Sequence, residues 1–142
     1  IVKVFTELGT LHGPYERFHI NGQPSTKGFF KDGYLNGFYE RFYENGMLEL
    51  KDTRINGWAH GKRLRFYIDG SLAEEDEFIE GVLYKNGIVA NGEYQYLFSQ
   101  DGPVRRTVNY VDGLRHGLES IYNLDGEVQV SWLFENGKLV DN

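Results

Sequence analysis

Residues Gly37 to Gly61 read GFYERFYENGMLELKDTRINGWAHG, and the same order of glycines, aromatics and turn residues recurs along most of the chain. Within this stretch, Asn45-Gly46 separates the β-prone run FYERFY from the run MLELKDTR. An Asn-Gly pair between two such runs is a strong hairpin signal. Asn56-Gly57 and His60-Gly61 bracket a second turn, which we expect to be looser. The stretch therefore predicts a repeat built on one β-hairpin.

The spacing of the glycines gives the period of the repeat. Three series are spaced by 24 residues: Gly13, Gly37 and Gly61; Gly22, Gly46 and Gly70; Gly9, Gly33, Gly57 and Gly81. From Gly81 to Gly113 the interval is 32, so eight extra residues lie near VLYKNGIVANGE. Such a period is typical of stacked repeat arrays. We expect a single domain over 1–142, with repeats near 13–36, 37–60, 61–84, 93–116 and 117–140 and an insertion near 82–92.

The composition limits the classes of function. The 142 residues suit one domain. Fifteen basic and 21 acidic side chains give a net charge of -6, and an acidic chain is repelled by a phosphate backbone, so we expect no nucleic-acid partner. The absence of cysteine excludes disulfides and thiolate metal sites. No apolar run approaches the roughly 20 residues that span a bilayer.

The compartment stays open at this stage. The chain begins at Ile1 without a methionine, and a leader removed from it would leave no trace in the sequence. Of the alternatives, a cytoplasmic location is favoured.

The register of each hairpin follows from a three-residue turn that ends in a left-handed glycine. This turn pairs an aromatic with an apolar residue in every repeat: Phe18 with Pro24, Phe42 with Leu48, Phe66 with Leu72, Phe98 with Val104, and Tyr122 with Val128. By alternation, the same side, which we expect to be the core, also carries Phe30, Phe78, Tyr110 and Phe134. Each repeat advances about 10 Å, which predicts an elongated, twisted antiparallel ribbon.

The opposite side of the first three repeats alternates tyrosine and arginine. We expect it to display Tyr15, Arg17, His19, Tyr39, Arg41, Tyr43, Arg63, Arg65 and Tyr67, with Lys27 and Lys51 across the hairpins. Tyrosine offers contact area at a small entropy cost and arginine a planar fork for carboxylates or phosphates, so these residues are the predicted partner-binding site. The alternative is an ordinary exposed sheet, in which Arg41 pairs with Glu49 and Arg63 with Glu75.

The last two repeats differ on this side. The residues that replace the tyrosine-arginine pattern there are Gln95, Leu97, Ser99, Glu119, Ile121 and Asn123. The predicted interface therefore lies in the first three repeats.

Neither catalysis nor metal binding is indicated. The serines lie outside a G-x-S-x-G motif. His12, His60 and His116 recur just before a glycine, but equivalent positions in adjacent repeats lie about 10 Å apart, too far to share one ion. We expect these histidines to stabilise turns. The sequence thus predicts a protein that is not an enzyme and needs no cofactor or metal.

Repeats of the form G-x-Y-E-R-F-Y-E-N-G-x-L, followed by a second strand and N-G-x-x-H-G, resemble the variant class of MORN repeats (membrane occupation and recognition nexus). The resemblance covers about five repeats, from Leu8 to Lys138. It departs at the insertion and at Lys85, which stands where the repeat has a glycine.

The resemblance implies a function as well as a fold. The variant class includes bacterial antitoxins, and the wider MORN group is associated with scaffolding and with phospholipid binding. A protein-binding module that blocks a partner, such as a toxin, by covering its surface is therefore expected. The alternative is a peripheral phospholipid-binding or scaffolding module. The oligomeric state stays open.

Overall fold

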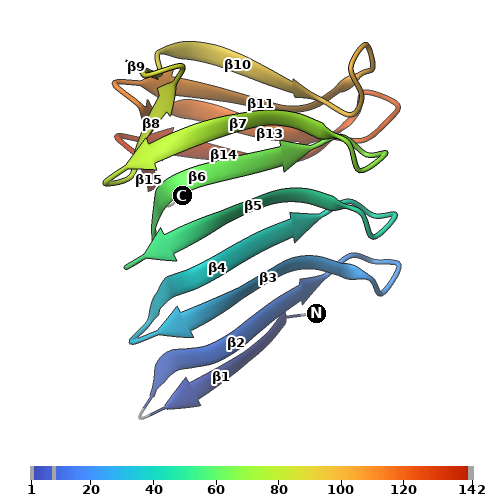
Figure 1. Ribbon diagram of the computed structural model, residues 1–142. Coiled ribbons are helices and arrows are strands. Elements are labelled where there is room, and N and C mark those ends of the chain that lie inside the picture. The colour runs from blue at the N-terminus through green and yellow to red at the C-terminus, as the bar shows by residue number, and fades with distance from the viewer. Residues whose placement is uncertain (1, 8, 141–142) are drawn as a thin grey trace. The chain divides into compact units, whose positions relative to one another are not determined.

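The structure is a computed structural model that describes residues 2–7 and 9–140, with side chains from residue 9 onward. Every regular element among these residues is a β-strand, as Figure 1 shows, and the strands form antiparallel sheets of successive hairpins. The predicted all-β hairpin fold is confirmed. No helix of the described part is long and apolar enough to cross a membrane.

The chain divides into two compact units, Ile1–Glu80 and Gly81–Asn142. We call them the N-terminal unit and the C-terminal unit. The boundary falls at the start of the predicted insertion. A single repeat domain over the whole chain, and its elongated form, stay predictions.

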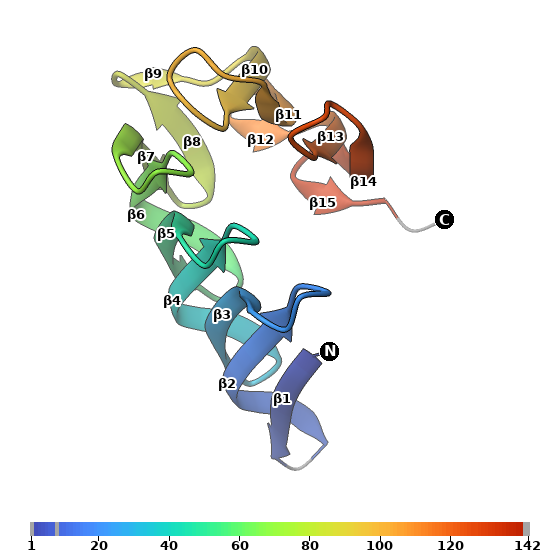
Figure 2. The ribbon, with the colours of Figure 1, turned by 90° about the vertical axis from the view of Figure 1, so that its right-hand side faces the viewer.

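The N-terminal unit is one open sheet whose strand order follows the chain (Figure 1). Its strands are β1 (Val2–Glu7), β2 (Thr10–Phe18), β3 (Pro24–Lys31), β4 (Tyr34–Phe42), β5 (Leu48–Ile55), β6 (Trp58–Phe66) and β7 (Leu72–Ile79). Figure 2 views these strands from the end at which the three-residue turns lie. Each strand pairs with the next in sequence, so neighbouring hairpins are joined by the same backbone hydrogen bonds as the two strands of one hairpin.

The C-terminal unit contains a short hairpin and a second open sheet. The insertion forms the hairpin, from β8 (Val82–Lys85) and β9 (Ile88–Val89). The sheet has the order β10 (Gly92–Leu97), β11 (Val104–Val111), β13 (Gly117–Tyr122), β14 (Val128–Glu135) and β15 (Lys138–Leu139). The short β12 (Leu114–Arg115) pairs with β11.

Two kinds of turn alternate along the chain. At the first kind, Tyr43 N–H donates to the Met47 carbonyl at 2.9 Å, and Gly46 has a φ of 86°, which confirms the three-residue turn. At the second kind, Asn56 and Gly57 both have positive φ, 50° and 86°, and Ile55 faces Trp58 directly. The second turn is therefore a tight two-residue turn, and the expectation that it is the looser one is wrong.

The predicted register is confirmed in four of the five hairpins: Phe18 faces Pro24, Phe42 faces Leu48, Phe66 faces Leu72, and Tyr122 faces Val128. In the remaining hairpin Leu97, not Phe98, faces Val104. Its turn is one residue longer, because Phe98 N–H donates to the carbonyl of Pro103 at 3.0 Å, five residues on. When Gly102 is aligned with the turn glycines of the other hairpins, such as Gly46, this extra residue is not apparent from the sequence.

A bulge beyond each three-residue turn inverts the predicted faces. In the second hairpin Phe42 faces Leu48 but Arg41 faces Leu50, so Glu49 is an extra residue. One extra residue reverses the alternation of the rest of the strand. Phe30 therefore lies with Tyr15, at a ring distance of 5.1 Å, on the side of the tyrosines and arginines.

The predicted core face is therefore wrong. The most buried side chains of the N-terminal unit, including Leu50 and Phe78, share the side of the tyrosines and arginines. We call this side the Tyr-Arg face and define it by the nine predicted residues, from Tyr15 to Tyr67, given above.

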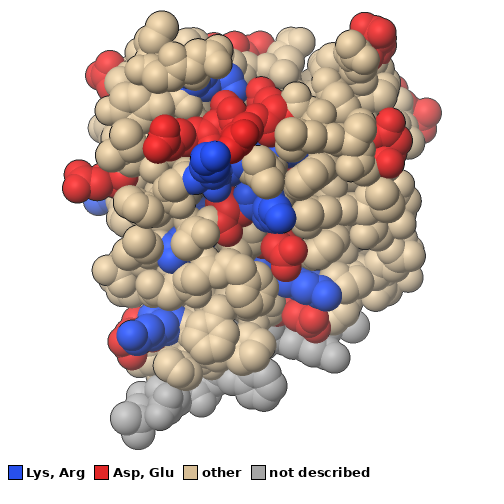
Figure 3. Space-filling model, in the orientation of Figure 1, with Lys and Arg blue, Asp and Glu red and all other residues tan. Residues whose placement is uncertain are grey.

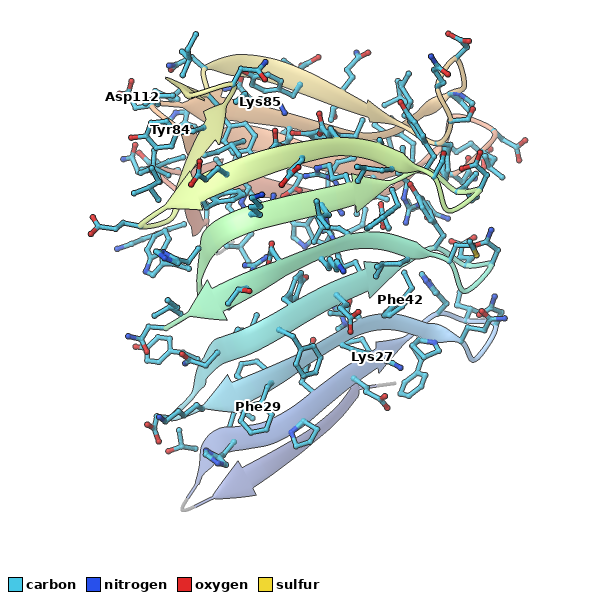
Figure 4. All side chains as sticks on the ribbon, in the orientation of Figure 1. Lys27, Phe29, Phe42, Tyr84, Lys85 and Asp112 are labelled. Atoms are coloured by element: carbon cyan, nitrogen blue, oxygen red, sulfur yellow. The ribbon has the colours of Figure 1, made fainter. Side chains whose placement is uncertain are left out.

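The other side of the N-terminal unit, which we call the ladder face, carries a row of alternating charges. Across β2 to β5 the register places Glu16, Lys27, Glu40 and Lys51 side by side. Figure 3 shows acidic and basic side chains following one another over this face. The prediction that Lys27 and Lys51 lie on the Tyr-Arg face is wrong. Figure 4 shows Lys27 beside Phe42, with its ammonium 5.5 Å from the ring centre.

Candidate binding face

The structure brings the nine predicted residues together on one side of the N-terminal unit. Arg17, Arg41 and Arg65 lie in one row, on alternate strands. They differ in access, however. Arg17 is exposed, whereas Tyr43, Arg63 and Arg65 are only 3–9% exposed. The five others are half-buried: Tyr15, His19, Tyr39, Arg41 and Tyr67.

Asp52 explains why the arginines toward the C-terminal end of this face are buried. The Asp52 side chain is 1% exposed, and its carboxylate accepts two hydrogen bonds from Arg54, at 2.7 and 3.1 Å, and one from Arg63, at 3.0 Å. The guanidinium of Arg54 stacks 4.2 Å from the centre of the Tyr39 ring, and that of Arg63 stacks 4.2 Å from Phe78. A chain of stacked rings, guanidiniums and a carboxylate thus crosses β4 to β7.

For both Arg54 and Tyr15, burial shifts the pKa in one direction and a neighbouring charge shifts it in the other. Burial lowers the pKa of Arg54, and the Asp52 carboxylate opposes the shift. Because the ordinary pKa of arginine is so high, Arg54 keeps its charge at neutral pH. Burial also raises the pKa of the Tyr15 phenol, and the charge of Arg17 opposes that shift. Tyr15 is therefore a neutral hydrogen-bonding group beside a cation.

Arg65 also has an acidic neighbour on its own face. Its guanidinium lies 3.4 Å from the carboxylate of Glu74, on the facing strand β7. The next residue, Glu75, points to the ladder face and pairs with Lys62 at 2.9 Å, so the alternative pairing of Arg63 with Glu75 is wrong. Carboxylates thus neutralise the Tyr-Arg face over β5 to β7.

Over β2 to β4 the carboxylates of the strands do not share the Tyr-Arg face. The carboxylates of these three described strands, Glu16 and Glu40, both point to the ladder face, where they flank Lys27. Arg17 and Arg41 lie on the Tyr-Arg face there, with Tyr15 and Tyr39 beside them. Gly28 lies between the two tyrosines, and a Cβ built on it would lie 3.7 Å from the Tyr39 ring.

Two of the predicted residues join neighbouring repeats. Tyr43 donates its hydroxyl hydrogen to the carbonyl of Phe66 at 2.7 Å, and His19 Nε2 lies 2.8 Å from the carbonyl of Phe42. A second series runs through the turns, where Asn21 donates to Glu44 O at 2.7 Å and Asn45 to Ile68 O at 3.2 Å. These polar atoms serve the stacking of repeats.

The C-terminal unit continues the aromatic pattern in a different register from the predicted one. Because the fourth turn is longer, Tyr94, Tyr96 and Phe98 take the places assigned to Gln95, Leu97 and Ser99, and that assignment is wrong. Phe98 has no hydroxyl group, and Arg105 instead donates to the carbonyl of Tyr122 at 3.2 Å.

An arginine-carboxylate cluster recurs in the C-terminal unit. Glu119 is held by Arg106 and, at 2.9 Å, by Arg115, which stacks 4.0 Å from the Phe134 ring. Lys85, at the position where the repeat has glycine, places its ammonium 5.0 Å from Tyr94 and 5.4 Å from Tyr96. A carboxylate shared by two arginines thus occurs in both units.

The expected role of the histidines in turns is confirmed for His116. Its Nδ1 accepts a hydrogen bond from Asn136 N–H, 20 residues on, at 3.4 Å. Asn36 takes the same role in another repeat and accepts from Asn56 N–H at 3.2 Å. Within the described residues, no group of three or more His, Asp or Glu side chains is arranged to hold a metal ion.

Sequence reasoning missed the acids that share the Tyr-Arg face. Asp52 and Glu74 follow the extra residues Glu49 and Ala73 by an odd number of positions, which places them on the Tyr-Arg face. The sequence contains this signal, but it can be used only once the position of the bulge is known. No family model matches the chain, and no curated protein matches it significantly.

Proposed function

We propose that the chain is a protein-binding repeat module of the MORN-variant type, without catalytic activity, built from about five 24-residue repeats. It acts by covering the surface of a partner protein, as an antitoxin or immunity protein does. The observation that carries the proposal is the part of the Tyr-Arg face on β2 to β4. There Arg17 is exposed, Tyr15, Tyr39 and Arg41 are half-buried, and the carboxylates of those strands, Glu16 and Glu40, point to the ladder face.

The chemistry of this surface favours an acidic patch on the partner. Tyrosine and arginine are enriched among the residues that contribute most to protein interfaces. Two rows of such residues on a sheet need little reordering on binding, because the strands fix their spacing. The internally neutralised stretch over β5 to β7 supports this surface as a rigid base.

A phospholipid surface is the alternative partner. Arg17 and Arg41 could meet lipid phosphates, and each basic residue near an anionic membrane contributes about 1 kcal/mol. The net charge of -6 opposes the approach of the chain to such a membrane. A protein partner is therefore favoured.

Two charge reversals on opposite faces test the proposal. Arg17→Glu and Lys51→Glu change the net charge equally, and both residues are exposed, but only Arg17 lies on the Tyr-Arg face. The wild-type chain is used to capture proteins from a lysate of its source cells, and a captured protein is then purified and titrated. We expect Arg17→Glu to weaken its affinity at least tenfold and Lys51→Glu to leave it within about twofold.

Circular dichroism confirms that both variants fold. Equal losses in the two variants would contradict the assignment of the face. Binding to vesicles that contain phosphatidylserine, lost in Arg17→Glu and with no protein captured, would support the lipid alternative instead.

A further inference from the structure

The sheet of the C-terminal unit ends in a strand whose outer edge is open. Among the described residues, β14 pairs with β13 along most of its length but with β15 only over its last two residues (Figure 2). The carbonyl of Leu133 accepts the N–H of Val140 at 2.8 Å on the β15 side. Because backbone groups alternate along a strand, the N–H and the carbonyl of Ser131 point to the same side, beyond the reach of β15.

The burial of equivalent residues shows what this edge lacks. Val130 follows the extra residue of its hairpin and is 38% exposed. Its equivalents in three other repeats, Thr26, Leu50 and Arg106, are 8%, 0% and 2% exposed. Each of these three faces a residue on both neighbouring strands, whereas Val130 faces only Ile121, on β13. A further strand beside β14 would therefore bury Val130 as its equivalents are buried.

The sequence of β14 does not deter such a strand. Residues 128–134 read VQVSWLF, without a charge, a proline or a glycine. Charged side chains and prolines are the usual means by which an edge strand avoids pairing with other chains. By contrast β7, the last strand of the N-terminal unit, carries four successive acids at residues 74–77. β14 therefore permits a pairing that the charges of β7 would oppose.

The shape of the edge selects an extended segment as its partner. Such a segment meets the open backbone groups by joining the sheet as an added strand. Within the chain, β4 lies in this way beside β3, and β6 beside β5. Side chains of the segment would alternate between the side of Val130 and Trp132 and the side of Ser131. An apolar or aromatic side chain fits beside the first two.

Charge favours a basic segment. The C-terminal unit holds eight acidic and five basic side chains, and two of the basic ones, Arg105 and Arg106, are buried. Asp125 and Glu127 are both exposed at the three-residue turn before β14. The C-terminal end of an antiparallel segment would lie toward this turn. An acidic surface attracts basic partners at long range.

We propose that the outer edge of β14 binds a basic, extended segment of a partner protein as an added antiparallel strand. The segment exchanges backbone hydrogen bonds with Ser131 and covers Val130. The Tyr-Arg face of β2 to β4 takes no part in this contact. The inference therefore goes beyond the proposed function, and each stands or falls without the other.

A peptide copied from β6 is a suitable probe, because β6 lies beside β5 as the segment would lie beside β14. Residues 62–68, KRLRFYI, contain three bases and no acid. Residues before 62 are left out, because β15 and Val140 already lie at that end of β14. In the chain, Leu64 faces Lys51, which is the equivalent of Ser131. The peptide should therefore place Leu64 beside Ser131.

Methyl groups on single backbone nitrogens test the added strand directly. Tyr67 N–H donates toward β7, to the carbonyl of Ser71 at 2.8 Å. By alternation, the N–H of Arg65 also points to β7 and that of Leu64 points to β5. In the complex the Leu64 N–H would meet β14, and the Arg65 N–H would face solvent. The two methylated peptides have the same charge and the same mass.

Fluorescence anisotropy of the labelled peptide measures its binding to the full chain. We expect saturable binding with a Kd between about 10 μM and 1 mM. Methylation at Leu64 should weaken binding at least about tenfold, because the methyl group replaces the hydrogen that bonds to β14. Methylation at Arg65 should change the affinity by less than about threefold, because that N–H has no partner in the complex.

Ser131→Pro makes the same test from the side of the protein. The Ser131 N–H points outward, so proline removes no bond to β13, and an edge strand tolerates proline at such a position. Binding should weaken at least about tenfold. The matched control is Ser131→Ala, because both variants lose the 2.7 Å hydrogen bond between the hydroxyls of Ser131 and Ser120. Ser131→Ala should bind like the wild type, and the methylated peptides give a test that does not depend on the fold of either variant.

Three results would overturn the inference. One is no binding of the unmodified peptide up to about 1 mM. Another is equal affinity of the two methylated peptides, since attraction of charges alone would bind both. The third is self-association of the chain that Ser131→Pro abolishes and that keeps the peptide from binding, because the partner of the edge would then be a second copy.

Discussion

Replacing Tyr43 by phenylalanine removes one oxygen from a buried position and leaves the ring in place. The hydroxyl donates to the Phe66 carbonyl at 2.7 Å, and the residue is 3% exposed. A hydrogen bond of this kind contributes about 0.5–1.5 kcal/mol net, and a buried carbonyl left without its donor costs about 1–3 kcal/mol. We expect Tyr43→Phe to lower the free energy of unfolding by about 1–2 kcal/mol.

Equilibrium unfolding in urea, followed by circular dichroism, measures this loss. The control is Tyr34→Phe, which removes a hydroxyl from an exposed ring and should change stability by less than about 0.5 kcal/mol. The denaturant slope should be the same in all three proteins, since no surface is added or removed. Equal stability of the two variants would refute the reasoning, because the bond between repeats would then contribute nothing beyond the ring.

Two further predictions concern the charges and the phenol of the Tyr-Arg face. Asp52→Asn should destabilise the protein by about 3–5 kcal/mol, because the buried Arg63 and the half-buried Arg54 lose their shared carboxylate. Glu75→Gln, at an exposed ion pair, should cost under about 1 kcal/mol, and urea unfolding compares the two variants. Because the folded-state pKa of Tyr15 is raised, the unfolded chain loses the phenol proton first as pH rises. The stability of the wild type should therefore fall as pH rises through about 10, and more steeply than that of Tyr15→Phe. Equal slopes of stability against pH in the two proteins between about pH 9 and 11 would argue against the shift.

The three-residue turns could be predicted from the sequence because their chemistry is local. Asn45-Gly46 supplies the left-handed glycine, and the facing of Phe42 and Leu48 follows from the turn length alone. The fourth turn does not follow this rule. Its Asp101-Gly102 pair has the residue types of the other turns, although this turn has four residues instead of three.

The two faces could not be predicted because the bulge has no common chemistry. The extra residues of the five hairpins are Ser25, Glu49, Ala73, Arg105 and Gln129, which share neither size nor charge. Once the bulge is missed, every later position in the strand is assigned to the wrong side. The contact of Arg63 with Asp52 could therefore not be predicted, because the two residues lie in different hairpins.

The bonds between repeats also bear on how the chain reaches this structure. Those of His19, Tyr43, Asn21 and Asn45 each join residues 23 apart. Closing a loop of that length costs little more entropy than closing a single hairpin. A hairpin can therefore dock as soon as the following one has been synthesised, without waiting for the rest of the chain. Low contact order of this kind is associated with rapid folding, one repeat after another.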